Sequence, residues 1–182
     1  MATSDLFQVI PLPDSPVWTG AGQEWETVER ELGTALPEDY CELIAFYGSG
    51  GFCGTFSIAS SFGGKRGLKS KHDMRTEFFR GMLSSYGDSR ISVYPDKGGI
   101  LYFGGDEYTN SLTWLTEGEP DEWPLVWFDD HMSQYEVFNM GIVEFLLEWT
   151  SGRVTPKVHK GLFDKPPLER RPLFRPSPQP KR

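Results

Sequence analysis

Residues 25–58 read WETVERELGTALPEDYCELIAFYGSGGFCGTFSI, and this stretch decides the fold class. Its first segment carries apolar side chains at helical spacing: Trp25, Val28 and Leu32. Gly33 follows as a C-cap, so the segment predicts a short amphipathic helix.

A second helix is predicted to begin at Pro37, because a proline at the first helical position loses no hydrogen bond there. Its apolar stripe consists of Tyr40, Leu43, Ile44 and Tyr47. The helix ends at Gly48, and residues from Phe52 to Ile58 alternate as in a strand. The opening part of the domain is therefore helix, helix, strand.

Downstream, a third helix is predicted from a capping box at Ser70 and Asp73 and a stripe of four apolar side chains. The stripe is Met74, Phe78, Phe79 and Met82. Short strands separated by turns follow at 91–94, 100–103, 111–115, 125–128 and 134–138. A last amphipathic helix covers 141–150. The pattern predicts a single α+β domain with about four helices packed on a mostly antiparallel sheet of about six strands.

Two segments flank the predicted domain, which covers 23–152. Residues 1–22 hold three prolines and no helical period, which predicts an extended N-terminal arm. Residues 153–182 hold seven of the 14 prolines and nine of the 18 Lys and Arg residues. This composition buries too little apolar surface to offset chain ordering, so a flexible basic tail is expected.

Charge is divided unevenly along the chain. Residues 1–152 carry 24 Asp and Glu against 9 Lys and Arg, a balance of −15, whereas the tail carries 2 against 9, or +7. Between Lys97 and Arg153 there are 11 acidic residues and no Lys or Arg. Such a field repels nucleic acid and anionic membranes and attracts basic proteins. A solvated acidic surface that serves only solubility is the alternative.

The sequence contains no apolar run long enough to cross a bilayer, and its start lacks the basic and apolar segments of a signal peptide. We therefore expect a cytoplasmic protein. Its two cysteines, Cys41 and Cys53, are expected to be reduced core thiols.

Motifs for catalysis or cofactor binding do not fit the sequence. Gly64-Lys65 lacks the upstream glycine and the following Ser or Thr of a phosphate-binding loop. The three histidines are dispersed, and no nucleophile lies in a recognised motif. Abundant adjacent carboxylates do not by themselves make an acid–base pair. We expect no enzyme activity, no cofactor and no metal.

The string Trp25-x-x-Val28-Glu29-x-x-Leu32-Gly33-x-x-Leu36-Pro37-x-Asp39-Tyr40-x-x-Leu43, followed by Tyr47-Gly48-Ser49-Gly50-Gly51-Phe52, resembles the N-terminal signature of the SUKH superfamily. This superfamily includes the yeast cell-wall assembly regulator family. Further similarity, in Tyr102-Phe103-Gly104-Gly105-Asp106 and in the final helix, extends the resemblance to about residues 24–151. The run Gly48-Ser49-Gly50-Gly51 departs from the Asn-Gly-Gly often found after the second helix.

The resemblance implies an α+β binding scaffold without shared catalytic residues. Bacterial members are mostly taken to be immunity proteins that neutralise polymorphic or contact-delivered toxins, often nucleases, and eukaryotic members act as regulators and scaffolds. With the acidic balance, it suggests an immunity protein that binds a cognate basic toxin by mimicking nucleic acid charge. The alternative is a regulatory or structural scaffold that binds several proteins, with the arm and the tail as docking segments.

Partner contacts are expected from acids and exposed aromatics of the stretch without cations, because aromatic anchors dominate binding energy and carboxylates steer a basic partner. The candidates are Asp106, Glu107, Tyr108, Trp114, Asp129, Asp130 and Tyr135.

Overall fold

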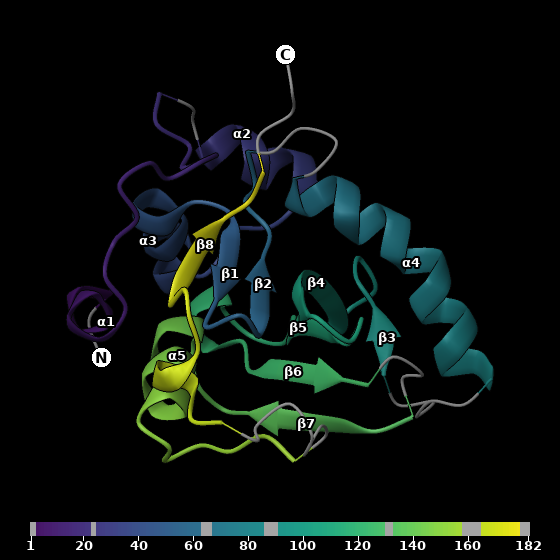
Figure 1. The fold of residues 1–182 in the computed structure, drawn as a ribbon. Helices are drawn as coiled ribbons and strands as arrows, with labels where there is room; N and C mark the ends of the chain where they lie inside the picture. The colour runs from purple at the N-terminus through teal and green to yellow at the C-terminus, as the bar shows by residue number, and fades with distance from the viewer. Residues whose placement is uncertain are drawn as a thin grey trace.

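The computed structural model describes residues 3–22, 25–62, 67–85, 91–129, 133–157 and 165–178. Within these residues the chain is a single α+β domain of five α-helices packed on an open, mostly antiparallel sheet of eight strands (Figure 1). The helices are α1 (Thr3–Val9), α2 (Trp25–Leu32), α3 (Glu38–Tyr47), α4 (Leu68–Ser85) and α5 (Ile142–Thr150). The strands are β1 (Gly50–Phe52), β2 (Phe56–Ile58), β3 (Ser92–Val93), β4 (Gly99–Asp106), β5 (Ser111–Leu115), β6 (Leu125–Phe128), β7 (Tyr135–Phe138) and β8 (Phe174–Pro176).

The predicted fold class is confirmed, and most predicted elements lie where the sequence places them. Helices α2, α3 and α5 cover the predicted segments, and β4 to β7 form the predicted antiparallel meander. The sheet order is β7-β6-β5-β4-β2-β1-β8, with the short β3 paired parallel to β4.

The stretch from 52 to 58 is not one strand. Strands β1 and β2 form an antiparallel hairpin in which Phe52 pairs with Phe56. Between them, Cys53 (φ 50°) and Gly54 (φ 63°) have left-handed backbone conformations that reverse the chain. In the sequence Phe52, Phe56 and Ile58 all fall at even positions, so the period-two pattern concealed the turn.

The prediction of an extended N-terminal arm is wrong for residues 3–9, which form α1. Leu6 and Ile10 are fully buried in the main core, and the Tyr47 hydroxyl donates a hydrogen bond to the carbonyl of Ile10. The prediction of a flexible tail is wrong for residues 174–176, which form β8 and extend the sheet beside β1 (Figure 1). Burial of a few apolar side chains thus orders both segments despite their prolines.

Helix α4 begins two residues before the predicted capping box, so Ser70 lies inside the helix rather than at its cap. Its buried face consists of Leu68, His72, Phe79 and Leu83. The predicted stripe is therefore wrong in part, because Met74 is 73% exposed and Phe78 is 38% exposed. Because His72 and Leu83 are buried, the face of α4 that packs on the sheet lies away from Met74 and Phe78.

The helices cover the sheet unequally, with α4 on one side and α1, α3 and α5 on the other (Figure 1). Under α4 lies a small apolar cluster that includes Phe79, Tyr102 and Phe128. The larger core lies on the opposite side and is rich in aromatic rings. There Trp114 stacks on Phe103, with ring centroids 4.1 Å apart, and meets Tyr40 edge to face at 4.9 Å.

Strand pairing defines two ends of the sheet. Ser111 pairs with both Gly105 and Phe128, and Phe128 pairs with Tyr135. The β4–β5 and β6–β7 connections therefore leave from one end, which we call the 106/128 end. The β5–β6 connection and the start of α5 lie at the other, which we call the 115/125 end.

We expect Trp114→Ala to lower the free energy of unfolding by about 3–5 kcal/mol, because it removes a large ring from a packed core. Urea denaturation measures this loss. The matched variant, Tyr108→Ala, removes a ring that is 56% exposed and should change stability by less than about 0.5 kcal/mol. Equal effects of the two variants would contradict this packing.

Candidate functional site

The 106/128 end brings together most of the predicted partner-binding residues. Glu107 and Tyr108 lie in the β4–β5 connection, and Asp129 and Tyr135 flank the β6–β7 connection. Tyr108 is 56% exposed and Tyr135 is 39% exposed, as binding anchors require. Asp130 lies outside the described residues.

Two of the predicted acids at this end stabilise the loops in which they lie. The Asp106 carboxylate accepts hydrogen bonds from the backbone N–H groups of Tyr108 (2.8 Å) and Asn110 (3.1 Å) and from the Asn110 amide. The Asp129 carboxylate accepts bonds from the N–H and the hydroxyl of Ser133, both at 2.7 Å. Both carboxylates thus already accept several hydrogen bonds within their own turns, which leaves fewer for a partner.

The prediction that Trp114 is an exposed anchor is wrong. Its side chain is 1% exposed and lies in the main core, on the side of β5 that packs against Tyr40 of α3. Strand alternation places Trp114 on one of the two faces of β5, but it does not show which face is buried. That depends on the helices that pack on the sheet.

The basic tail lies at the same end of the sheet. The Arg170 guanidinium donates a hydrogen bond to Thr55 Oγ1 (3.1 Å) in the β1–β2 turn. Arg171 and Arg175 line one groove together with Glu107. The 106/128 end therefore carries charges of both signs and is not a purely acidic surface.

Five carboxylates of the described residues gather at the 115/125 end, around a shallow groove. We call it the acidic cluster, and it consists of Glu38, Asp39, Glu42, Asp121 and Glu144. Its acids come from the first two turns of α3, the first turn of α5 and the β5–β6 connection. Neither Lys nor Arg is among the described residues that line this groove.

Hydrogen bonds fix the acidic cluster to the fold. Asp121 Oδ1 accepts the N–H of Glu38 (2.7 Å), and Asp39 Oδ2 accepts the N–H of Val143 in the first turn of α5 (3.1 Å). The Thr3 hydroxyl donates to Glu42. Burial, with Asp121 nearby, raises the pKa of Asp39. Burial and the surrounding carboxylates likewise raise the pKa of the Cys41 thiol to about 12.

The sequence does not reveal the acidic cluster, because its members are far apart along the chain. One local signal was present: Glu38 and Glu42 are four residues apart and so lie on the same face of α3. Their proximity to Asp121 and Glu144 depends on tertiary packing, which residue spacing does not show.

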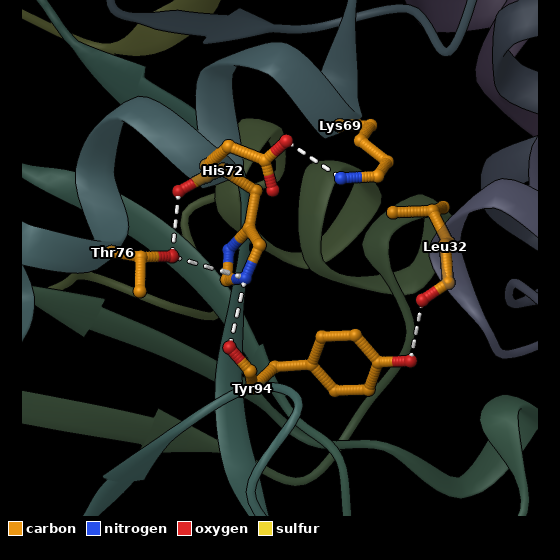
Figure 2. Close-up of polar contacts among 6 residues, drawn as sticks. Leu32, Lys69, His72, Thr76 and Tyr94 are labelled. Carbon is orange, nitrogen blue, oxygen red and sulfur yellow. Dashed lines mark hydrogen bonds and ion pairs between the residues drawn. The ribbon is translucent and has the colours of Figure 1, made fainter.

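A second polar group lies where α4 meets the β3–β4 region (Figure 2). His72 is 3% exposed, and its Nδ1 accepts the backbone N–H of Tyr102 (3.3 Å). Its Nε2 must then carry the proton that it donates to the carbonyl of Tyr94 (3.1 Å). The Tyr94 hydroxyl in turn donates to the carbonyl of Leu32 (2.7 Å), which joins α2 to this group.

Both nitrogens of His72 are thus used by backbone groups, and burial lowers the pKa of its imidazole. These observations describe a structural histidine that connects α4 with β3 and β4. A general base needs a free ring nitrogen that faces a substrate, and His72 has none.

Nothing in the described residues assembles a metal site, since no three His, Cys, Asp or Glu side chains converge with suitable geometry. The thiol of Cys53 is buried, and its pKa is raised by burial to about 11. No described helix is long and apolar enough to span a bilayer.

Comparisons with known proteins found no matching family model, no similar curated protein and no similar solved structure.

Replacement of Asp39 tests how the acidic cluster is joined to α5. We expect Asp39→Ala to lower the free energy of unfolding by about 1 kcal/mol, because α5 loses the acceptor for the N–H of Val143. Asp39→Asn keeps an acceptor and should lose less. Thermal and urea denaturation measure both variants, and equal losses would show that the hydrogen bond is not the cause.

The His72 group predicts a specific pH dependence. Because the pKa of folded His72 lies below its usual 6.5, the unfolded chain binds the proton first as pH falls. Stability from this group is therefore complete at pH 7.5 and is lost as pH falls from about 6.5 through the folded pKa. The difference in unfolding free energy between wild type and His72→Gln should shrink over that window. Parallel pH curves for the two proteins would contradict this.

Proposed function

We propose that this chain is a binding protein that neutralises a basic toxin, and that the acidic cluster at the 115/125 end is its contact surface. One observation carries the choice of surface: within the described residues, five carboxylates gather around one groove that no Lys or Arg lines. Such a field raises the association rate of a cationic partner.

The resemblance to SUKH domains supports the role of immunity protein. Its signature residues form α2, α3 and β1, and α3 carries three of the five acids of the cluster. The first turn of α3 is thus both part of the resemblance and part of the proposed contact surface.

The predicted contact residues of the 106/128 end take a secondary place in this proposal. Asp106 and Asp129 are hydrogen-bonded within their loops, and Glu107 shares a groove with Arg171 and Arg175. Tyr108 and Tyr135 stay available as aromatic contacts. A cationic partner meets less repulsion at the 115/125 end.

The scaffold alternative required the arm and the tail as free docking segments. Helix α1 and strand β8 are instead packed on the domain, which reduces what these segments offer to several partners at once. The immunity role needs neither segment and is therefore the hypothesis we put first.

A paired charge-removal experiment tests the contact surface. Binding is measured against the products of the neighbouring genes, among which the proposal expects a basic toxin. Glu38→Gln combined with Glu144→Gln should weaken that binding by at least about fivefold, mainly through slower association. The loss should shrink as salt is raised, because screening reduces the steering. Stopped-flow or surface-plasmon measurements give the rates, and growth of toxin-producing cells gives the biological readout.

Two further double variants separate the alternatives. Glu26→Gln with Glu31→Gln removes the same charge from exposed positions of α2 and should change binding by less than about twofold. Glu107→Gln with Tyr108→Ala tests the 106/128 end. A large loss there, with none at Glu38 and Glu144, would move the contact surface; absence of binding by the wild-type chain would refute the toxin-neutralising role.

A further inference from the structure

Strand β8 is a short segment that joins the sheet from far along the chain. Gly51 pairs with Arg175 and Phe52 with Phe174, in antiparallel register. The carbonyl of Leu173 accepts the N–H of Cys53 (2.7 Å), and the N–H of Ser177 donates to the carbonyl of Ser49 (2.8 Å). The segment between α5 and β8 comprises residues 151–173.

One aromatic side chain anchors this strand. The ring of Phe174 lies 4.8 Å from that of Phe52 and 5.1 Å from that of Tyr47, between centroids. Gly50 makes the space for it, because a Cβ there would meet the Phe174 ring at 2.3 Å. Tyr47, Gly50 and Phe52 thus form a slot for one aromatic ring, which we call the Phe174 slot.

The Phe174 slot is independent of β8 in its construction. Tyr47 belongs to α3, and β1 is paired on its other side with β2, which is itself paired with β4. Departure of β8 therefore leaves the slot and the hydrogen-bonding edge of β1 in place. Short edge segments with few buried side chains open at lower free energy than the core of a sheet.

Prolines make the outer side of β8 unsuitable for a further strand. Pro176 lies within the strand, and Pro172 and Pro178 flank it, so three backbone donors are missing. The sheet consequently ends at β8. On this side of the sheet, opposite the β7 edge, an added strand must pair with β1 in the place that β8 occupies.

We propose that the edge of β1 with its Phe174 slot is a strand-addition site, which residues 174–176 occupy in cis until an extended segment of a partner protein, with an aromatic residue opposite Phe52, displaces them. Main-chain pairing supplies affinity in such complexes, and the side-chain pocket supplies specificity. This site goes beyond the proposed toxin-binding surface and is separate from it.

A second copy of this chain is a poor occupant of the site. Its tail offers the same contacts as the cis tail, whose covalent attachment to the domain gives it an effective concentration on the order of millimolar. At micromolar protein concentration the cis strand therefore wins. A partner segment must bind more tightly than RRPLFRPSP, the chain's own residues 170–178.

A labelled RRPLFRPSP peptide and the full-length protein test the proposal. Phe174→Ala in the protein empties the slot, so this variant should bind the peptide at least about tenfold more tightly than wild type does, by fluorescence anisotropy. A peptide with alanine in place of its phenylalanine has the same charge and should not bind. Adding Gly50→Ala to the Phe174→Ala protein should abolish binding, because it fills the slot.

Equal binding by wild type and Phe174→Ala, or by the two peptides, would overturn the proposal. Hydrogen exchange of the wild-type protein gives an answer that does not depend on a variant folding. The amides of Cys53 and Ser177 should exchange at least about tenfold faster than the Ala59 amide, which bonds to Phe103 in the middle of the sheet. A common rate for all three, or wild-type dimers at micromolar concentration, would also overturn it.

Discussion

Antiparallel pairing of β4 to β7 is the constraint on which the functional interpretation depends. Consecutive connections of a meander leave from opposite ends of the sheet. The long stretch without Lys or Arg runs through this meander, so its carboxylates are divided between two ends. A linear charge pattern that suggests one acidic face therefore becomes two separate groups of acids.

The two ends differ because of what packs beside them. At the 115/125 end, the first turns of α3 and α5 add Glu38, Asp39 and Glu144 to Asp121 of the β5–β6 connection, and the next turn of α3 adds Glu42. At the 106/128 end, the segment that leads into β8 brings Arg170 to the β1–β2 turn. Helix starts favour acids through their dipole, so the same residues that stabilise these helices also create the acidic cluster.

Local signals predicted an element well where apolar side chains fill most of its positions. Helix α5 has seven buried residues out of nine, and the predicted range 141–150 differs from the observed one by one residue at its start. Helix α4 was less predictable because His72 occupies a core position and satisfies two backbone groups, while Met74 points to solvent. From residue types alone, the buried face of such a helix is predicted at the wrong rotation about the helix axis.

The candidate site was harder to predict than the fold because exposure is a tertiary property. Trp114 and Tyr108 are both aromatic residues of the acidic stretch, yet one is 1% and the other 56% exposed. In the described part of the tail few residues are buried, as its composition indicates. The composition could not show that one ring, Phe174, finds a prepared slot beside Gly50.

The docked tail also bears on which acids a partner meets. A free tail could sample the whole acidic body, whereas β8 fixes Arg175 beside β1 and its neighbours near Glu107. The two proposed sites lie at opposite ends of α3, since Asp39 is in its first turn and Tyr47 is its last residue. Release of β8 would free Arg175 from the edge of β1. The Phe174 slot that this opens lies at the end of α3 opposite the acidic cluster. A partner strand at β1 and a cationic partner at the 115/125 end can therefore bind the same molecule without sharing contacts.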